Sequence, residues 1–358
     1  MNQFIYSTNI VSDLADFFSS VSDNTSYFIV SDENTHKYCV PLISKCVPGN
    51  YKNLVMGTGE FNKNLNTCNT LWKLLINGGA DRKSLIINVG GGLVTDVGGF
   101  VAATYMRGIR FVNIPTSLLG MVDASAGGKT GIDIDFFKNM VGIFAFPETV
   151  LVAPEFLDTL PDKEWRNGIA EMLKHGLIAD DNQWKELSSA VMKGNLFELS
   201  DEFKRIVIKH ILASVKVKTD IVNKDPYEKH ERKFLNFGHT IGHALETYSL
   251  RHNNQPLSHG EAIAIGMVCE SYLSARLTGL DKNNVDEVSK TILSLFNHHP
   301  INKNSFQEVY LLMKSDKKAE KESISMALLK SIGHPVLFDG VQHELILEAF
   351  HFYNSLQG

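Results

Sequence analysis

Several features that would decide the class of a protein are missing from this sequence of 358 residues. It has four cysteines, and they form neither a C-x-x-C pair nor a regular framework, so they are expected to be reduced thiols of a cytosolic protein. Residues 1–6 lack the basic start and apolar core of a signal, and the longest apolar runs are far short of a membrane span. We therefore expect a cytoplasmic protein with no membrane partner.

An excess of positive charge is also missing. The chain has 35 Lys and Arg residues against 40 Asp and Glu residues, a net charge of −5. Without a global basic field, binding to nucleic acid is not expected, and any anion must be bound by a local cluster of cations. The hydrophobic content of 44% is ordinary for a globular protein, and the length predicts two domains.

Two standard nucleotide motifs are absent. The glycine cluster Gly90–Phe100 follows a predicted strand but lacks G-x-G-x-x-G spacing. Its backbone N–H groups could approach a pyrophosphate, although a tight turn would need the same glycines, so both interpretations stay open. Gly128-Lys129 has no glycine five residues earlier, which excludes a P-loop. Residues 123–139 are instead expected to be a loop, either solvated or bringing Lys129 and Asn139 to a small phosphorylated ligand.

The order of predicted elements divides the chain. Short apolar strands alternate with helical spacing in the first part, which is typical of an α/β Rossmann-like domain with a mainly parallel sheet. The expected strands are 27–32, 53–56, 84–89, 111–114 and 149–153, and the clearest helix is 64–76. Helical periodicity dominates afterwards. We therefore predict an α/β domain over 1–158 and an all-α domain over 159–358.

Three histidines occur within 21 residues of the helical part. His239 and His243 are four residues apart and would share one helix face, while His259 opens a second apolar helix. Imidazoles meeting at a turn between helices favour a metal site, and the alternative is that they are helix-end and core histidines. Glu171 shares a helix with Lys174 in an otherwise apolar setting, where a carboxylate needs a cation, either a metal or a lysine.

Together these stretches resemble the 3-dehydroquinate synthase family, a group of sugar-phosphate cyclases, along nearly the whole chain. The matching motifs are G-E-x-x-K (59–63), G-G-G-L-V-T-D-V-G-G-F (90–100), A-A-T-Y-M-R-G (102–108), P-T-S-L-L (115–119), V-D-A-S-A-G-G-K-T-G (122–131), K-N-M-V-G (138–142), G-I-A-E-M-L-K-H-G-L-I (168–178), R-K-F-L-N-F-G-H-T-I-G-H-A-L-E (232–246), L-S-H-G-E-A (257–262) and D-K-K (316–318). The chain departs from the usual pattern at Phe61, where Gln is common, and at Ala124, where Ser is usual. Because of Phe61, the contacts to the adenosine side of the cofactor are not predicted from the family pattern.

The resemblance implies an NAD-binding α/β domain, a helical metal-binding domain and an active site in the cleft between them. It implies metal ligation by Glu171, His239 and His259, with zinc as the usual ion and cobalt as a possible one. The expected catalytic residues are His243, which matches a proton-handling position, with Asp123, Lys174 and Asn236. The NAD contacts implied are Asp32, Glu60, Lys63, Gly91, Gly92, Asp96, Thr116 and Leu119. The substrate contacts implied are Arg107, Lys129, Asn139, Lys218, Arg232 and Lys318 (or its neighbour Lys317), and because Arg107 matches a residue that reaches the neighbouring subunit's site, a homodimer is expected.

The activity implied is conversion of 3-deoxy-D-arabino-heptulosonate 7-phosphate to 3-dehydroquinate and phosphate in the shikimate pathway. In the family's reaction, NAD accepts a hydride from the substrate, phosphate is eliminated, NADH returns the hydride, and an aldol step closes the ring. Other sugar-phosphate cyclases are the nearest alternative. A metal-dependent polyol dehydrogenase needs no phosphate contacts, so Lys129, Asn139 and Arg232 argue against it. An NAD-binding module that has lost catalytic activity would lack one of the metal ligands or the lysines expected to bind substrate. All of these residues are present.

Overall fold

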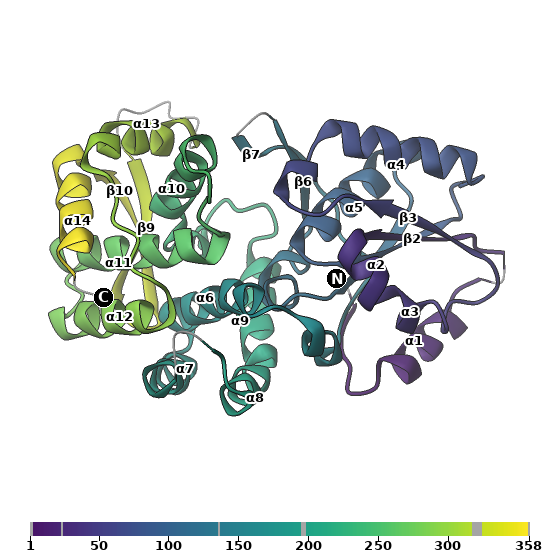
Figure 1. The fold of residues 1–358 in the computed structure, drawn as a ribbon, viewed down its shortest axis with the longest axis horizontal. Helices are drawn as coiled ribbons and strands as arrows, with labels where there is room; N and C mark the ends of the chain where they lie inside the picture. The colour runs from purple at the N-terminus through teal and green to yellow at the C-terminus, as the bar shows by residue number, and fades with distance from the viewer. Residues whose placement is uncertain (1–2, 23, 135–136, 195–197, 317–323, 357–358) are drawn as a thin grey trace. The chain divides into compact units, whose positions relative to one another are not determined.

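A computed structural model of the chain describes residues 3–22, 24–134, 137–194, 198–316 and 324–356 (Figure 1). Contacts within the chain form two compact units, Met1–Trp165 and Arg166–Gly358. The functional domains predicted at 1–158 and 159–358 stay a prediction, because the contacts test compactness and not function.

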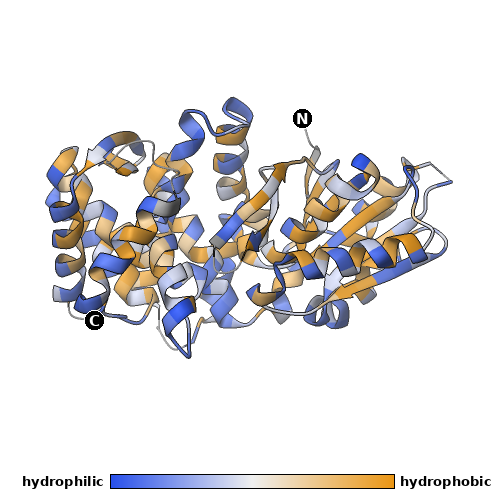
Figure 2. Cartoon of the chain, turned by 90° about the horizontal axis from the view of Figure 1, so that it is seen from above, coloured by the Kyte–Doolittle hydropathy of each residue, from blue (hydrophilic) through white to orange (hydrophobic). Residues whose placement is uncertain are grey.

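The first unit contains a six-stranded parallel sheet in the order β1-β8-β5-β4-β2-β3. Its strands are β1 (Gln3–Tyr6), β2 (Tyr27–Asp32), β3 (Tyr51–Met56), β4 (Leu85–Gly90), β5 (Arg110–Pro115) and β8 (Thr149–Val152). Every residue of β4 is buried, as expected for a parallel strand covered on both faces, and the strands of this sheet are correspondingly apolar in Figure 2. The predicted α/β class with a parallel sheet is confirmed.

Helices of the first unit pack against this sheet. They are α1 (Ile10–Ser19), α2 (Glu33–Tyr38), α3 (Val40–Ile43), α4 (Leu65–Asn77) and α5 (Gly92–Thr104). In α4, Cys68, Leu71 and Leu75 form the buried face, and the Asn64 side chain caps the first turn by accepting the Thr67 N–H at 3.0 Å. The helical spacing predicted over 64–76 is therefore confirmed.

One segment of the first unit differs from the expectation of a loop. Strands β6 (Lys129–Ile134) and β7 (Phe137–Phe144) pair with each other in an antiparallel arrangement. Gly131 and Gly142 are paired residues, and a Cβ at either position would lie only 2.7 or 2.4 Å from a backbone oxygen of the opposite strand. These glycines permit the close pairing of the two strands. They also interrupt the alternation of apolar and polar residues by which a strand is recognised in a sequence, so the segment was predicted to be a loop.

The second unit is largely helical, as predicted. Its longer helices are α6 (Asp162–Ala179), α7 (Asp181–Lys193), α8 (Asp201–Lys209), α9 (Ile211–Lys224), α10 (His239–His252), α11 (His259–Leu277), α12 (Lys282–Leu295), α13 (Phe306–Asp316) and α14 (His343–Ser355). Helix α11 is buried over most of its length and contacts α10, α12 and α14 (Figure 1). Within the described ranges, no helix is long and apolar enough to cross a membrane.

An antiparallel strand pair corrects the expectation that this domain is entirely helical. Strands β9 (Ile324–Ser331) and β10 (His334–Val341) meet at a turn where Gly333 has φ +79°. The run Met326–Leu329 is buried throughout, so it lacks the alternation that distinguishes a half-buried strand from a helix.

Candidate functional site

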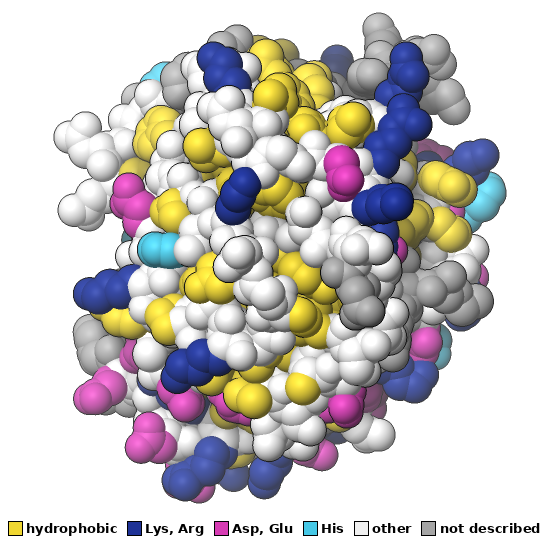
Figure 3. All heavy atoms as spheres, turned by 90° about the vertical axis from the view of Figure 1, so that its right-hand side faces the viewer, with side chains coloured by type: hydrophobic (Ala, Val, Ile, Leu, Met, Phe, Trp, Pro, Cys, Tyr) yellow, Lys and Arg dark blue, Asp and Glu magenta, His cyan; other side chains and the backbone are white. Residues whose placement is uncertain are grey.

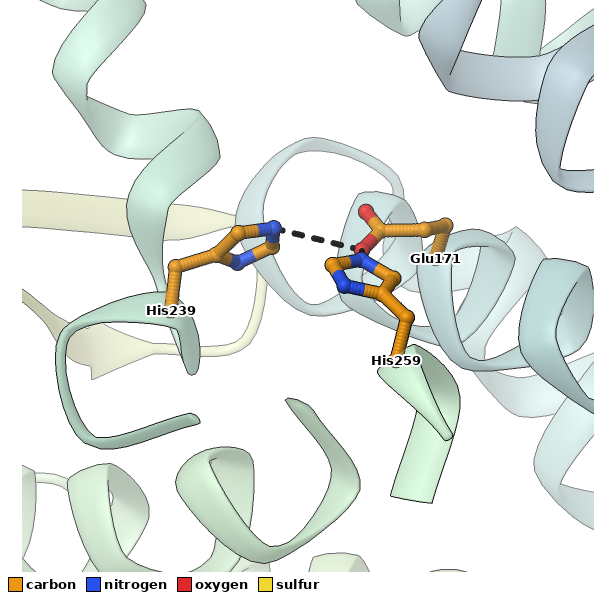
Figure 4. A group of neighbouring side chains, drawn as sticks. All are labelled: Glu171, His239 and His259. Carbon is orange, nitrogen blue, oxygen red and sulfur yellow. Dashed lines mark hydrogen bonds and ion pairs between the residues drawn. The ribbon is translucent and has the colours of Figure 1, made fainter. Parts of the chain in front are cut away.

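Three predicted metal ligands converge in the second unit. Glu171 lies within α6, His239 is the first residue of α10 and His259 is the first residue of α11. Oε1 of Glu171 lies 3.3 Å from Nε2 of His239 and 3.3 Å from Nε2 of His259. Figure 4 shows both imidazoles directed at the carboxylate. The structure thus brings together residues separated by 88 positions in the chain.

These distances fit a metal ion. Donors placed about 2.0–2.1 Å from a tetrahedral zinc ion lie about 3.3–3.4 Å from one another. One carboxylate and two imidazoles is also a donor set of catalytic zinc sites, which keep a position open for water or substrate. Glu171, His239 and His259 therefore have the chemistry and the spacing to hold such an ion.

The start of α11 is fixed by local hydrogen bonds. The sequence S-H-G-E forms a capping box in which Ser258 Oγ accepts the Glu261 N–H and Glu261 Oε2 accepts the Ser258 N–H at 2.7 Å. The Gly260 N–H donates to Asn167 Oδ1 at 2.9 Å, which links α11 to α6. His259 is thereby presented from a well-defined first turn.

Both imidazoles also have a partner at Nδ1. The Nδ1 of His239 lies 3.1 Å from the carbonyl oxygen of Phe237, an arrangement in which Nδ1–H donates and Nε2 keeps its lone pair. The Nδ1 of His259 lies 3.5 Å from Oε2 of Glu246, a side chain that is 4% exposed. Glu246 was not among the predicted residues, although a carboxylate in the apolar stretch A-L-E of a helix is a signal that it is paired.

Charge within the group is distributed unevenly. Burial alone would raise the pKa of Glu171, but Lys174, whose Nζ lies 2.5 Å from Oε2, and His239 hold that pKa well below its usual range. Burial lowers the pKa of His239 to about 4. Burial also acts to lower the pKa of His259, but hydrogen bonds to Glu171 and Glu246 outweigh it and raise the pKa to about 9. A carboxylate that stays ionised in a buried site is suited to hold a cation.

His243 lies beside this group. Its ring centroid is 5.1 Å from that of His239 and 6.0 Å from that of His259. It belongs to a second set of neighbouring donors with Glu246 and His259, rather than to the set around Glu171. The position is compatible with proton transfer near the metal, and the role of His243 stays a prediction.

The other predicted residues of the second unit are mostly buried. Lys174 is 1%, Arg232 2% and Lys218 8% exposed. Arg232 Nη1 donates to the carbonyl of Pro226 at 2.5 Å. Lysine and arginine side chains form strong charge-assisted hydrogen bonds with anionic groups. Lys317 and Lys318 lie outside the described residues.

Asn236 is hydrogen-bonded to Glu228, a residue that was not predicted from the sequence. Its Nδ2 donates to Oε1 of Glu228 at 2.8 Å, and Glu228 has φ +57°, which is uncommon for a residue other than glycine. The segment around Glu228 is ordered by Asp225, whose carboxylate accepts the N–H groups of Lys229, His230 and Arg232.

The residues expected to contact NAD lie in the first unit, and most follow the carboxyl ends of its parallel strands. Asp32 ends β2, Glu60 and Lys63 follow β3, Gly91, Gly92 and Asp96 follow β4, and Thr116 and Leu119 follow β5. The carboxyl ends of parallel strands meet at one edge of a sheet, the usual place for a dinucleotide. Gly90 and Gly98 serve packing, since a Cβ there would lie 2.4 Å from Val94 and 1.9 Å from Asn88. Gly91 directly precedes α5, and no side chain caps the first turn of this helix. Gly91 and Gly92 are therefore the glycines of the cluster at which a pyrophosphate could be bound.

Lys63 joins an expected cofactor residue to an expected substrate residue. This buried lysine pairs with Asp96 at 2.8 Å and donates to Oδ1 of Asn139 at 2.6 Å. Burial acts to lower the pKa of Lys63, but Asp96 and Glu60 outweigh it and raise the pKa. Lys63 therefore stays protonated and can donate.

The remaining predicted residues of this unit are distributed more widely. Asp123 lies in the short π-helical segment Gly120–Ala124, and Lys129 is exposed at the start of β6. Arg107 is exposed with φ +68°, directly after Met106 with φ +50°. Strain of this kind is concentrated at functional and interface positions.

Comparisons with known proteins identify the family of the chain. The family model described as 3-dehydroquinate synthase N-terminal matches residues 53–167, and the model described as 3-dehydroquinate synthase C-terminal matches residues 168–319. A 3-dehydroquinate synthase of Parabacteroides distasonis is 40% identical, covering 98% of this chain and 97% of its own. One of Leptospira interrogans is 38% identical, covering 95% and 92%.

A solved structure also matches the whole fold. The 2-deoxy-scyllo-inosose synthase complexed with carbaglucose-6-phosphate, NAD+ and Co2+ is 25% identical, with a TM-score of 0.82, and the match covers 98% of this chain and 96% of that one. The family models, the full-length relatives and this structure together span both units. The chain therefore belongs to the 3-dehydroquinate synthase family.

Proposed function

We propose that this chain converts 3-deoxy-D-arabino-heptulosonate 7-phosphate to 3-dehydroquinate and phosphate. The observation that carries the proposal is the group of Glu171, His239 and His259, in which Oε1 of Glu171 lies 3.3 Å from Nε2 of each histidine, a separation that zinc ligands have. The relatives at 38–40% identity over nearly the full chain carry the substrate and the reaction.

The proposed cofactors are NAD and a divalent ion, zinc or cobalt. When bound, the ion lowers the pKa of a coordinated substrate hydroxyl, and NAD accepts and returns a hydride. Glu171, His239 and His259 would hold the ion. The edge formed by the ends of β2, β3, β4 and β5 would hold NAD, and the matched structure was solved with NAD+ and Co2+.

The chain's own side chains supply the remaining chemistry. Lys174, Lys218 and Arg232 are buried cations suited to the phosphate and carboxylate of the substrate. His243 can accept or return a proton next to the metal group, since its ring lies 5.1 Å from that of His239. Asn236, held by Glu228, offers an amide oxygen to a substrate hydroxyl.

A second candidate is cyclisation of another sugar phosphate. It is favoured by the full-length match to 2-deoxy-scyllo-inosose synthase, and a substrate of that kind lacks a carboxylate. The higher identity to the 3-dehydroquinate synthases, 38–40% against 25%, favours the heptulosonate instead.

A phosphate-release assay with several substrates tests both candidates. Purified protein with NAD and zinc is expected to release inorganic phosphate from the heptulosonate phosphate without accumulating NADH. Release from glucose 6-phosphate and not from the heptulosonate would favour the second candidate. Steady NADH accumulation from glycerol without phosphate release would indicate a polyol dehydrogenase.

We also propose a homodimer in the cytoplasm. The homodimer rests on Arg107, an exposed and strained residue that matches a position reaching a neighbouring subunit's site in the family. Light scattering of the purified protein tests the dimer, and a monomer at micromolar concentration would overturn it.

A further inference from the structure

The helix that carries His239 does not cap itself. Helix α10 begins after Gly238, which has φ +80° and no side chain to accept the N–H groups of the first turn. The carboxylate of Glu270 accepts two of them, Gly238 N–H at 2.6 Å and Ile241 N–H at 3.1 Å. These hydrogen bonds lie on both sides of His239 in the sequence.

Glu270 is an unusual residue for this position. It is 0% exposed and lies within the apolar run of α11. A buried carboxylate is strongly destabilising unless it is hydrogen-bonded, and the first turn of a helix offers up to four N–H groups without partners. Charge-assisted hydrogen bonds of this kind are short and directional, so they fix the positions of both groups.

The same two helices are in backbone contact at this point. A Cβ on Gly266 of α11 would lie 1.9 Å from the carbonyl oxygen of Gly238. Gly266 and Glu270 are four residues apart and therefore share one face of α11. The first turn of α10 is thus held against α11 by a close contact and by two hydrogen bonds.

This connection bears on the metal group because α11 also begins with His259. Glu270 lies on the helix of one imidazole ligand and binds the first turn of the other. Its carboxylate therefore sets the position of His239 relative to His259. A metal site tolerates errors of only about 0.2 Å in its ligand distances.

We propose that Glu270 is a positioning residue of the metal centre, which holds His239 at the distance from Glu171 and His259 that an ion requires. This inference rests on the proposed metal-dependent function. The competing explanation is that Glu270 contributes only to the stability of the fold.

The metal affinity of a Glu270→Gln variant distinguishes these two explanations. The amide keeps one acceptor oxygen but turns an NH2 group toward the second N–H, so only one of the two hydrogen bonds can remain. We expect zinc affinity, measured by competition with a chelator, to fall about 10- to 100-fold, as for outer partners of metal ligands. The visible absorption of the Co2+-loaded protein is expected to change, because the position of one ligand changes.

Val288→Ala is the matched control. Val288 is also 0% exposed, but it lies on α12, a helix that carries none of the proposed metal ligands. It should lower the melting temperature while leaving zinc affinity and the Co2+ spectrum as in the wild type. If Glu270→Gln does not fold, Glu270→Asp, which is one methylene shorter and cannot reach both N–H groups, is judged by the same measurements.

Two results would overturn the proposal. One is wild-type zinc affinity in the folded Glu270 variant, and the other is an equal loss in Val288→Ala. Absence of metal binding by the wild type would instead contradict the proposed function, so the two failures are distinguishable in one titration series.

Discussion

Each unit of the chain contains a buried lysine that is paired with a carboxylate, and the two pairs behave differently. In the first unit Lys63 Nζ lies 2.8 Å from Oδ2 of Asp96, and in the second Lys174 Nζ lies 2.5 Å from Oε2 of Glu171. Burial raises the pKa of Asp96 in spite of Lys63, whereas the pKa of Glu171 is held well below its usual range.

The surroundings of each carboxylate account for the difference. Glu60 and Asp123 add negative charge around Asp96 and raise its pKa further. Glu171 has instead two imidazoles within 3.3 Å in addition to its lysine. A pair of an ammonium and a carboxylate group is thus a lysine surrounded by carboxylates in one unit and a carboxylate surrounded by cationic and donor groups in the other. Only the second arrangement prepares a carboxylate to bind a metal ion.

The largest effect is expected from Glu171→Gln. The change keeps the shape of the side chain but removes the negative charge that would hold the ion and balance Lys174. We expect zinc affinity to fall by more than about 100-fold, the upper end for outer partners of ligands, with a matching loss of phosphate release. Chelator competition measures the affinity. Unchanged zinc binding would mean that the low pKa of Glu171 does not reflect metal ligation.

The next effect separates the histidines. His239→Ala is expected to weaken metal binding strongly, but less than Glu171→Gln does, because it removes a neutral donor 3.3 Å from Glu171 and leaves the negative charge of that carboxylate. His243→Ala should keep the metal and slow turnover about 100-fold or more, as for loss of a general acid or base. Metal content after dialysis and steady-state turnover distinguish them. Equal loss of metal in both variants would show that the ligands were assigned wrongly.

A smaller effect concerns the lysines. Lys174→Met leaves the fully buried, ionised Glu171 without its main cation, and breaking such a pair costs about 3–5 kcal/mol. Lys63→Met should cost less, since Asp96 takes up a proton more readily. Thermal unfolding of the two metal-free variants should therefore give the lower melting temperature for Lys174→Met. The reverse order would contradict the contrast between the pairs.

The smallest effect is a dependence on pH. A carboxyl group whose pKa is raised by folding costs stability at neutral pH, and that cost disappears as pH falls through the raised pKa. A group whose pKa is lowered contributes stability above its unfolded pKa of 4.5, which is lost on further acidification. Asp96→Asn should thus lower the melting temperature at pH 7 by less than Glu171→Gln does in the metal-free protein. Both variants should approach the wild type in acid, and a constant difference across pH would argue against either assignment.

Much of this arrangement could be predicted from the sequence, and the failures have physical causes. The helices of His239 and His259 are apolar enough to be recognised, and the ends of the parallel strands follow from the order of elements. Strand β6 was missed because its glycine pairing replaces the usual alternation, and β9 because both of its faces are buried.

The site shows the same limit. Spacing alone left three histidines as candidates, and only the approach of Glu171, from a helix far away in the sequence, distinguishes His239 and His259 from His243. Glu228, Glu246 and Glu270 were missed because their partners are backbone groups or side chains that only folding brings near. A carboxylate within an apolar helix indicates that a partner exists without identifying it.

The two carboxylates at the helix starts have one more consequence. A helix carries about +0.5 of an elementary charge at its N-terminus, and both α10 and α11 begin at a proposed metal ligand. Two such ends would together repel a divalent cation by electrostatics alone. Glu270 at the start of α10 and Glu261 at the start of α11 each place a negative charge there. Helix N-termini ordinarily attract anions. The two carboxylates offset the positive partial charge at these N-termini, so that an ion of charge +2 can lie between them.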